Sequence, residues 1–270
     1  MAGRRPEASF LDRSDDRTLP ADFAGDVYVW DIDKTYLDTH FSSVLGLLGI
    51  PFELAIDKQA VPGAAALLRG LRHGPGVESA LAPIYFISGS PLQMRRTIGR
   101  KMTLDGVQFD GITFKDQLGL LLAGRPRGIS EQVGYKLKAL LLLRLGHPAG
   151  ARYTLFGDDV EQDQDSFLLF GEVCAGLRGL ALRKRLEAKG VHPRDLDEAV
   201  ALAADLPTGA PDPVVDVFIH QVRGGKALSQ DPRVRSSPSF LDHAETLRAL
   251  GKLRAEAVEA VRADVERRKR

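Results

Sequence analysis

The sequence predicts an α/β protein, a three-layer fold with a central parallel sheet. Short apolar segments recur along the chain and end in acidic or small polar residues, which is typical of strands buried on both faces. Stretches with apolar residues at helical spacing separate these segments, and that alternation indicates parallel strands joined by right-handed helical crossovers. At 270 residues the chain is long enough for one large domain or two small ones.

The expected strands are short apolar runs. The first follows a polar segment rich in Arg and Asp, residues 1–25, which we interpret as an N-terminal tail. The four runs are Val27 to Ile32, Ile84 to Ile87, Tyr153 to Phe156 and Val214 to Ile219. Because each is apolar nearly throughout, each fits a strand that is covered by helices on both sides.

The segments between these strands are expected to be helical. Proline near a start, apolar residues at helical spacing and glycine near an end mark them. They are Val61 to Leu71, Leu92 to Lys101, Lys136 to Leu145, Phe167 to Lys189 and Asp195 to Leu206. The pattern from Thr103 to Gly134 is weaker and predicts a strand, a helix and an irregular connection.

These elements set the expected domain boundaries. Residues 26–235 are predicted to form the main domain, with a helical insertion at about residues 171–207. The last segment, residues 236–270, carries leucine and valine at helical spacing. It predicts one C-terminal amphipathic helix from Phe240 to Arg270.

Composition excludes several classes of protein. Hydrophobic residues make up 44% and charged residues 27% of the chain, which argues against a disordered or fibrous protein. A formal charge of +1 gives no overall field toward nucleic acid, and no nucleic-acid partner is expected. The single cysteine, Cys174, can form neither an intrachain disulfide nor a multi-thiolate zinc site. Without a long apolar run or a signal-peptide pattern, a cytoplasmic protein with no transmembrane segment is expected.

Polar residues follow three of the expected strands. Asp31 and Asp33 follow the first, Ser88 the second, and a GDDVEQD segment with Asp158, Asp159 and Asp163 the third. In an open parallel sheet, ligands bind beyond the carboxyl ends of the strands, so these side chains are expected to face one crevice.

The types of these residues point to phosphate and magnesium. Paired carboxylates repel each other unless a cation joins them, and oxygen-only ligands suit Mg²⁺. Ser88 and Lys136 are candidates to hold phosphoryl oxygens. Lys138 lies on the same expected helix but faces another way, so only one of the two lysines can serve, and Lys136, at the start of the helix, is preferred.

These motifs, in this order, resemble the haloacid dehalogenase (HAD) superfamily of phosphotransferases, which has a Rossmann-like fold. The four motifs are DIDKT, FISGS, Lys136 and GDDVEQD, and the resemblance covers roughly Val27 to Phe170. Within the superfamily, the chain looks like the catalytic domain of the actin-patch-associated phosphatidate phosphatases and their bacterial relatives. It departs from that narrower pattern at Lys34, at the GDDV segment and in the expected helical insertion.

The resemblance implies a Mg²⁺-dependent phosphatase. Asp31 would attack phosphorus to form an aspartyl-phosphate, and Asp33 would protonate the leaving oxygen and then activate water. Ser88 and Lys136 would stabilise the charge on the phosphoryl group. The implied Mg²⁺ ligands are Asp31, the backbone carbonyl of Asp33, and Asp158, with Asp159 or Asp163 completing the set directly or through water.

Several alternatives stay open at this stage. The substrate could be phosphatidate or a soluble sugar, nucleotide or protein phosphate, and the chain could instead be an inactive module that binds Mg²⁺ or phosphate. Ser90 is interpreted as a helix N-cap, and His220 as an ordinary residue at a strand end. Asp165 is as readily a helix cap as a metal ligand. The segment from Tyr36 to Gln59 could form a lid over the crevice.

Overall fold

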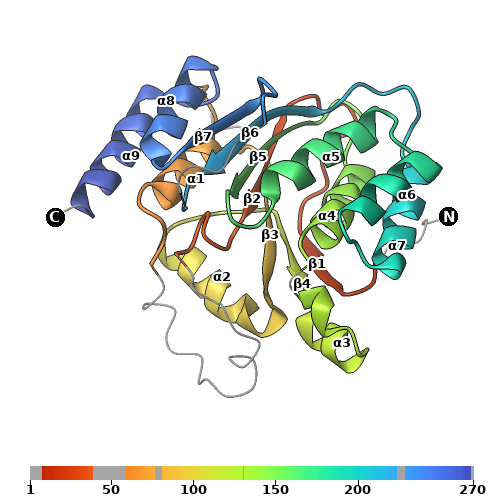
Figure 1. The fold of residues 1–270 in the computed structure, drawn as a ribbon. Coiled ribbons are helices and arrows are strands. Elements are labelled where there is room, and N and C mark those ends of the chain that lie inside the picture. The colour runs from red at the N-terminus through yellow and green to blue at the C-terminus, as the bar shows by residue number, and fades with distance from the viewer. Residues whose placement is uncertain (1–7, 39–58, 77–80, 130, 224–228, 269–270) are drawn as a thin grey trace.

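A seven-stranded sheet organises the protein in the computed structural model, which describes residues 8–38, 59–76, 81–129, 131–223 and 229–268 (Figure 1). In spatial order β1-β4-β3-β2-β5-β6-β7, strands β2 to β7 are parallel and only β1 runs antiparallel, on the edge beside β4. The strands are β1 (Leu11–Asp15), β2 (Asp26–Asp31), β3 (Ile84–Pro91), β4 (Gly111–Lys115), β5 (Arg152–Asp158), β6 (Val214–His220) and β7 (Val234–Ser237). The predicted α/β class with a central, mostly parallel sheet is confirmed.

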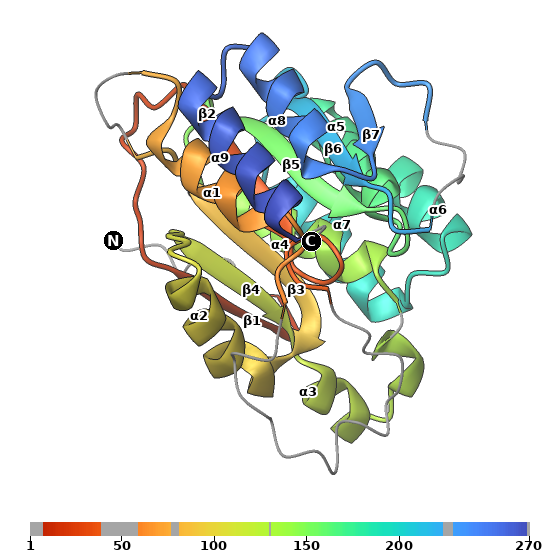
Figure 2. The same cartoon turned by 90° about the vertical axis from the view of Figure 1, so that its left-hand side faces the viewer.

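Helices cover both faces of the sheet (Figure 2). Side chains alternate along β2, so Val27 and Val29 enter one hydrophobic core while Tyr28 and Trp30 enter the other. The first core includes α4 (Val133–Gly146), α5 (Asp163–Ala175), α6 (Gly179–Ala188) and α7 (Pro193–Ala204). The second includes α1 (Ala64–His73), α2 (Arg95–Leu104), α8 (Phe240–Ala249) and α9 (Ala255–Arg267). The remaining short helices are η2 (Leu92–Met94), α3 (Gln117–Leu122) and η3 (Pro126–Ile129).

A row of stacked aromatic rings crosses the second core. Trp30 of β2 stacks on Phe156 of β5 at 4.1 Å between centroids, and Phe156 stacks on Phe218 of β6 at 5.0 Å. Phe240 at the start of α8 stacks on Trp30 at 5.6 Å. Because these strands also carry the predicted site at their carboxyl ends, the stack holds those ends together through packing in addition to the backbone hydrogen bonds.

The N-terminal region differs from the predicted tail. Residues 11–15 form β1, and the following backbone continues the attachment through a hydrogen bond from Asp16 N to Asp110 O at 2.7 Å. The sequence of β1, LDRSD, is polar because its strand lies at the edge of the sheet and is only half-buried.

Two predicted long helices are each divided in two. The helix expected from Phe167 to Lys189 ends after Ala175, where Gly176 adopts a φ of 128°. The helix expected from Phe240 to Arg270 breaks between α8 and α9, where Gly251 has a φ of 72°. Both glycines occupy conformations that other residues rarely adopt, so each ends its helix. α9 packs back against α1, with Val258 and Val261 in the core.

The helices of the described segments are all too short or too polar to cross a bilayer. Strand β7, with the sequence VRSS, was not among the predicted elements.

Candidate active site

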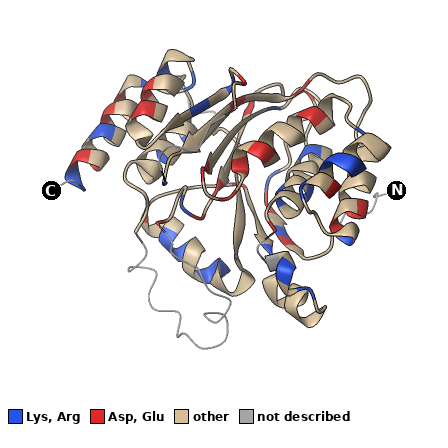
Figure 3. Cartoon of the chain, in the orientation of Figure 1, with Lys and Arg blue, Asp and Glu red and all other residues tan. Residues whose placement is uncertain are grey.

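The predicted polar residues converge because β2 lies between β3 and β5 in the sheet. Asp31 ends β2, Ser88 lies in β3 and Asp158 ends β5, and all three strands run parallel. Figure 3 shows acidic residues gathered at this carboxyl edge and in the first turn of α5, whereas acidic and basic residues are interspersed on α8 and α9.

A tight turn follows Asp31 and directs the next acidic side chain. The Ile32 carbonyl accepts hydrogen bonds from Tyr36 N at 3.0 Å and Leu37 N at 2.9 Å, and Lys34 N donates to the Leu37 carbonyl at 2.8 Å. Lys34 has a φ of 61°, a left-handed conformation that is uncommon for a non-glycine residue. The turn allows Asp31 and Asp33 to contact different neighbours.

Two serines of β3 hold Asp33. Ser88 Oγ donates to Asp33 Oδ2 at 3.2 Å, and Ser90 Oγ lies 2.7 Å from Asp33 Oδ1 and 3.0 Å from Oδ2. Ser88 Oγ also accepts from Ser90 N at 3.0 Å. The interpretation of Ser90 as a helix N-cap is wrong, because Pro91 precedes η2 and the Ser90 hydroxyl points to the acid. Predicted Ser88 and unpredicted Ser90 both orient Asp33.

Asp31, Asp158 and Asp163 form a buried acidic trio, with one carboxylate oxygen of each within 4.8 Å of the others. Asp31 Oδ2 and Asp158 Oδ2 have no hydrogen-bond partner. Asp158 Oδ1 accepts from Val160 N and Glu161 N, and Asp163 Oδ2 accepts from Asp158 N at 2.9 Å. Two oxygens of the trio are therefore available to a ligand, while hydrogen bonds from backbone amides hold Asp158 and Asp163 in place.

Burial raises the pKa of each aspartate of the trio. Burial, followed by the charge of Asp163, raises the pKa of Asp158 to about 8. Burial also raises the pKa of Asp31 well above its ordinary value, although Lys136 opposes this, and it raises the pKa of Asp163 as well. Carboxylates whose charged forms are this unfavourable are stabilised when a cation is bound between them.

Lys136 supplies the fixed positive charge of the site. Lys136 lies in the first turn of α4 and is fully buried. Its Nζ lies 2.9 Å from Asp31 Oδ1, 3.2 Å from Glu161 Oε2, and in contact with Asp163. Burial alone would lower the pKa of Lys136, but Asp163 and Asp31 raise it well above its ordinary value, so the side chain is charged.

Lys138 points to a different part of the molecule. Its Nζ lies 2.6 Å from Asp195 Oδ1 and 2.8 Å from Glu198 Oε2, and it donates to the Ser9 carbonyl at 3.1 Å. The preference for Lys136 over Lys138 agrees with this placement.

Asp159 lies outside the trio. Its Oδ1 accepts from Val222 N at 2.9 Å and Arg223 N at 3.2 Å, so it ties the β5 loop to the segment after β6. Of the two candidates for the outer metal position, the structure therefore brings Asp163 to the acidic trio and leaves Asp159 as a loop anchor. The Asp33 side chain is held by the two serines, so only the backbone carbonyl of Asp33 remains as its candidate metal ligand. Asp165 is half-exposed and pairs with Lys189 at 2.7 Å.

The site contains one acid that the sequence analysis missed. Glu161 approaches Lys136 and also lies 3.9 Å from Lys34, at Oε1 and Nζ. Glu161 lies inside the GDDVEQD motif, but at a position that the motif leaves variable. The motif therefore predicts no role for it. Gly157 of the same motif is required sterically, since a Cβ there would lie 2.3 Å from Asp163 Oδ2.

Comparison of the chain with models of protein families, with curated protein sequences and with solved structures finds no match. The predicted lid falls largely on residues 39–58, outside the described residues.

Proposed function

We propose that this chain is a Mg²⁺-dependent phosphomonoesterase of the HAD type that works through an aspartyl-phosphate on Asp31. The observation that carries the proposal is the environment of Asp31. Its carboxylate has a buried oxygen without a partner, while the other oxygen faces the ammonium of Lys136 at 2.9 Å. A second acid, Asp33, stands two residues later and is oriented by two hydroxyls.

The residues present fit a magnesium ion. Asp31 and Asp158 each have a buried oxygen without a hydrogen-bond partner among the described residues, and burial followed by the charge of Asp163 raises the pKa of Asp158. Asp31, Asp158 and Asp163 would hold the ion, with the Asp33 carbonyl as the remaining candidate. When bound, Mg²⁺ supplies charge neutralisation for the phosphoryl group and orients it.

Asp31 and Asp33 divide the chemistry between them. A carboxylate oxygen of Asp31 forms a bond to phosphorus while the bond from phosphorus to the ester oxygen breaks, and Asp33 gives its proton to the departing alkoxide. Asp33 then takes a proton from water as the water oxygen attacks phosphorus. This second displacement releases inorganic phosphate and restores the Asp31 carboxylate, with the proton back on Asp33.

The other residues of the site position these two acids. Ser88 and Ser90 donate hydrogen bonds to the Asp33 carboxyl group and fix its orientation. Lys136 offsets the negative charge that accumulates when a phosphate approaches three aspartates. Preorganised charge of this kind contributes much of the rate in phosphoryl transfer.

Phosphate release tests the proposal. We expect the purified chain to hydrolyse at least one of an aryl phosphate, a hexose 6-phosphate, a nucleoside monophosphate and phosphatidate in mixed micelles. Activity should require Mg²⁺, stop with EDTA, and fall at least about a thousandfold in Asp31→Asn. Asp26→Asn is the matched control, because Asp26 begins the same strand and pairs with Arg152 and Lys252 instead of the site.

Acid quenching of the reaction gives a second readout, a phosphorylated protein that forms with wild type and not with Asp31→Asn. Retained Mg²⁺ binding without phosphate release from any ester would contradict the phosphatase proposal. It would favour the alternative of a binding module.

A further inference from the structure

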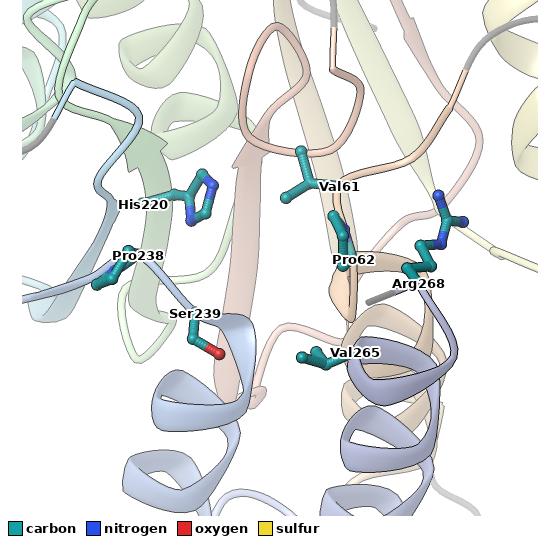
Figure 4. Close-up of a pocket in the computed structure, with 7 residues that line it drawn as sticks. All are labelled: Val61, Pro62, His220, Pro238, Ser239, Val265 and Arg268. Atoms are coloured by element: carbon teal, nitrogen blue, oxygen red, sulfur yellow. The ribbon is translucent and has the colours of Figure 1, made fainter. Parts of the chain in front are cut away.

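A cavity of about 360 Å³ lies beside the candidate active site (Figure 4). Its lining residues come from the start of α1, the carboxyl end of β6, the start of α8 and the end of α9: Val61, Pro62, His220, Pro238, Ser239, Val265 and Arg268. The volume falls in the range of small-molecule sites, which is about 300–1,000 Å³.

The cavity adjoins the acidic trio through the sheet. His220 ends β6 and pairs in register with Asp158, which ends β5. The His220 carbonyl also accepts a hydrogen bond from Asp159 N at 3.2 Å. The cavity and the trio thus lie at the same carboxyl edge of the sheet, on the neighbouring strands β6 and β5.

Polar and apolar groups both line the cavity. In Figure 4, His220, Pro238 and Ser239 lie on one side, and Val61, Pro62, Val265 and Arg268 lie on the other. The Arg268 guanidinium donates to the Ala60 carbonyl at 2.8 Å. Nδ1 of His220 is buried and has no hydrogen-bond partner among the residues that the structure describes. The Ser239 oxygen accepts from Leu241 N at 3.2 Å as the N-cap of α8, which leaves its hydroxyl hydrogen to donate.

We propose that this cavity receives the leaving group, and that it fits the hydroxyl-bearing carbon skeleton of a compact sugar or polyol monophosphate. The proposal rests on the phosphatase function proposed above. Hydroxyl groups match the imidazole nitrogen and the Ser239 hydroxyl, and the C–H face of a sugar matches valine and proline. A diacyl lipid is less suited to this cavity, because its long apolar chains match neither polar group.

His220→Phe isolates the hydrogen-bonding group from the packing. The His220 ring stacks on Phe240 at 4.9 Å with an interplanar angle of 18°, an arrangement that phenylalanine can keep while losing the ring nitrogen. His243→Phe is the matched control. His243 also packs on Phe240, at 5.5 Å, is also buried with an unpartnered ring nitrogen, and does not line the cavity.

The experiment compares kcat/KM for a hexose 6-phosphate and for acetyl phosphate, whose leaving group is too small to fill the cavity. We expect His220→Phe to lower kcat/KM about tenfold or more for the hexose ester and less than about threefold for acetyl phosphate. Val61→Phe, which narrows the cavity from the opposite wall, should give the same selective loss. His243→Phe should leave kcat/KM unchanged for both substrates. Thermal unfolding checks that each variant is folded.

The outcomes separate the two proposals. Equal changes for the hexose ester and acetyl phosphate, or none, in folded His220→Phe and Val61→Phe would overturn the assignment of the cavity while leaving the phosphatase intact. Hydrolysis of phosphatidate or a nucleotide, but not of the hexose ester, would overturn the substrate class. If wild type released phosphate from no ester, the phosphatase function itself would fail, and the cavity assignment would fail with it.

Discussion

Two buried lysines, two residues apart on α4, stand in opposite electrostatic environments. Lys138 contacts Asp195 and Glu198, and both of these acids have a lowered pKa, with Lys138 opposing the cost of burial in each. Arg125 adds a second cation beside Asp195. In this network the largely buried Lys138 and Arg125 face two carboxylates, and the more exposed Arg194 lies 3.5 Å from Glu198. The lowered pKa of each carboxylate means that its charged form is stabilised.

Lys136 has the reverse surroundings. Its ammonium contacts the carboxylates of Asp31, Asp163 and Glu161, and its charge also lowers the pKa of Asp158, against the effect of burial. The pKa of each aspartate in this group is raised, and two of their oxygens have no partner. Burial alone therefore does not show that a charged residue belongs to a functional site. An excess of one sign, with free ligand atoms, distinguishes a site that binds something from a network that supports the fold.

The largest expected effect separates the two lysines directly. Lys136→Met should lower kcat/KM at least about a hundredfold, because the phosphoryl group then meets the aspartates without the fixed cation. Lys138→Met should leave kcat within about threefold but lower the free energy of unfolding by roughly 2–3 kcal/mol, since it removes the buried cation that Asp195 and Glu198 share. Phosphate release and urea unfolding measure the two effects. A folded Lys138→Met protein without activity would contradict the conclusion that Lys138 serves only the fold.

The acidic trio predicts an unusual dependence of stability on pH. Asp158 has a pKa of about 8 in the folded protein against 3.8 as its ordinary value. The folded state thus keeps a proton that the unfolded chain loses, so the contribution of Asp158 to stability falls as pH rises from about 4 to about 8. In EDTA we expect a loss of a few kcal/mol across this window, and Mg²⁺ should restore stability at pH 8.

Thermal unfolding between pH 5.5 and 8.5, with EDTA or Mg²⁺, checks this dependence. Asp158→Asn removes one of the three titrating acids and should make the profile shallower in EDTA. A stability that rises with pH in wild type but not in Asp158→Asn would show that the carboxylate is charged in the folded protein, and would contradict the raised pKa.

A smaller effect is expected for two acids in the first turn of α5. Asp163 is buried in the trio, whereas Asp165 pairs with Lys189 near the surface. Asp163→Asn should raise the Mg²⁺ concentration that gives the half-maximal rate about tenfold or more, because it weakens Mg²⁺ binding. Asp165→Asn should leave that concentration unchanged, and equal shifts in both variants would show that α5 contributes only general charge.

The smallest effect concerns the serine that holds Asp33. Ser90→Ala removes a hydroxyl 2.7 Å from Asp33 Oδ1 and leaves Ser88 in place. We expect kcat to fall about three- to tenfold for alkyl phosphates, whose leaving oxygen needs a proton, and less for aryl phosphates. The ratio of the two rates measures proton donation, and an unchanged ratio would indicate that Ser90 acts only on folding.

The sequence predicted the sheet core and the meeting of Asp31 with the acids that follow β5, because both depend on local patterns, but it left the choice between Asp159 and Asp163 open. Runs such as VYVWDI are continuous and apolar, and acids directly after parallel strands must meet at one edge. Edge strands β1 and β7 were missed because partial exposure permits polar sequences such as LDRSD and VRSS. Two helices were predicted too long because apolar spacing continues through Gly176 and Gly251, and only the backbone conformation reveals the breaks.

Site residues were missed or misplaced where tertiary packing decides. Ser90 carries a plausible cap pattern, SGSP, and only the closeness of β3 to the β2 loop turns it toward Asp33. Asp159 and Asp163 both follow a strand end, and the choice between them depends on the backbone amides of Val222 and Arg223, which are more than sixty residues away in sequence.

The aromatic stack beneath the site also gives the protein an optical reporter. Trp30 is the only tryptophan of the chain, is fully buried, and immediately precedes Asp31. Its ring lies against Phe156, two residues before Asp158. Fluorescence excited at the red edge of protein absorption therefore comes from Trp30 alone. Its ring belongs to β2, which ends at Asp31, and packs on β5, which ends at Asp158. Titration of Mg²⁺ or phosphate can be followed by the intensity of this fluorescence without a label.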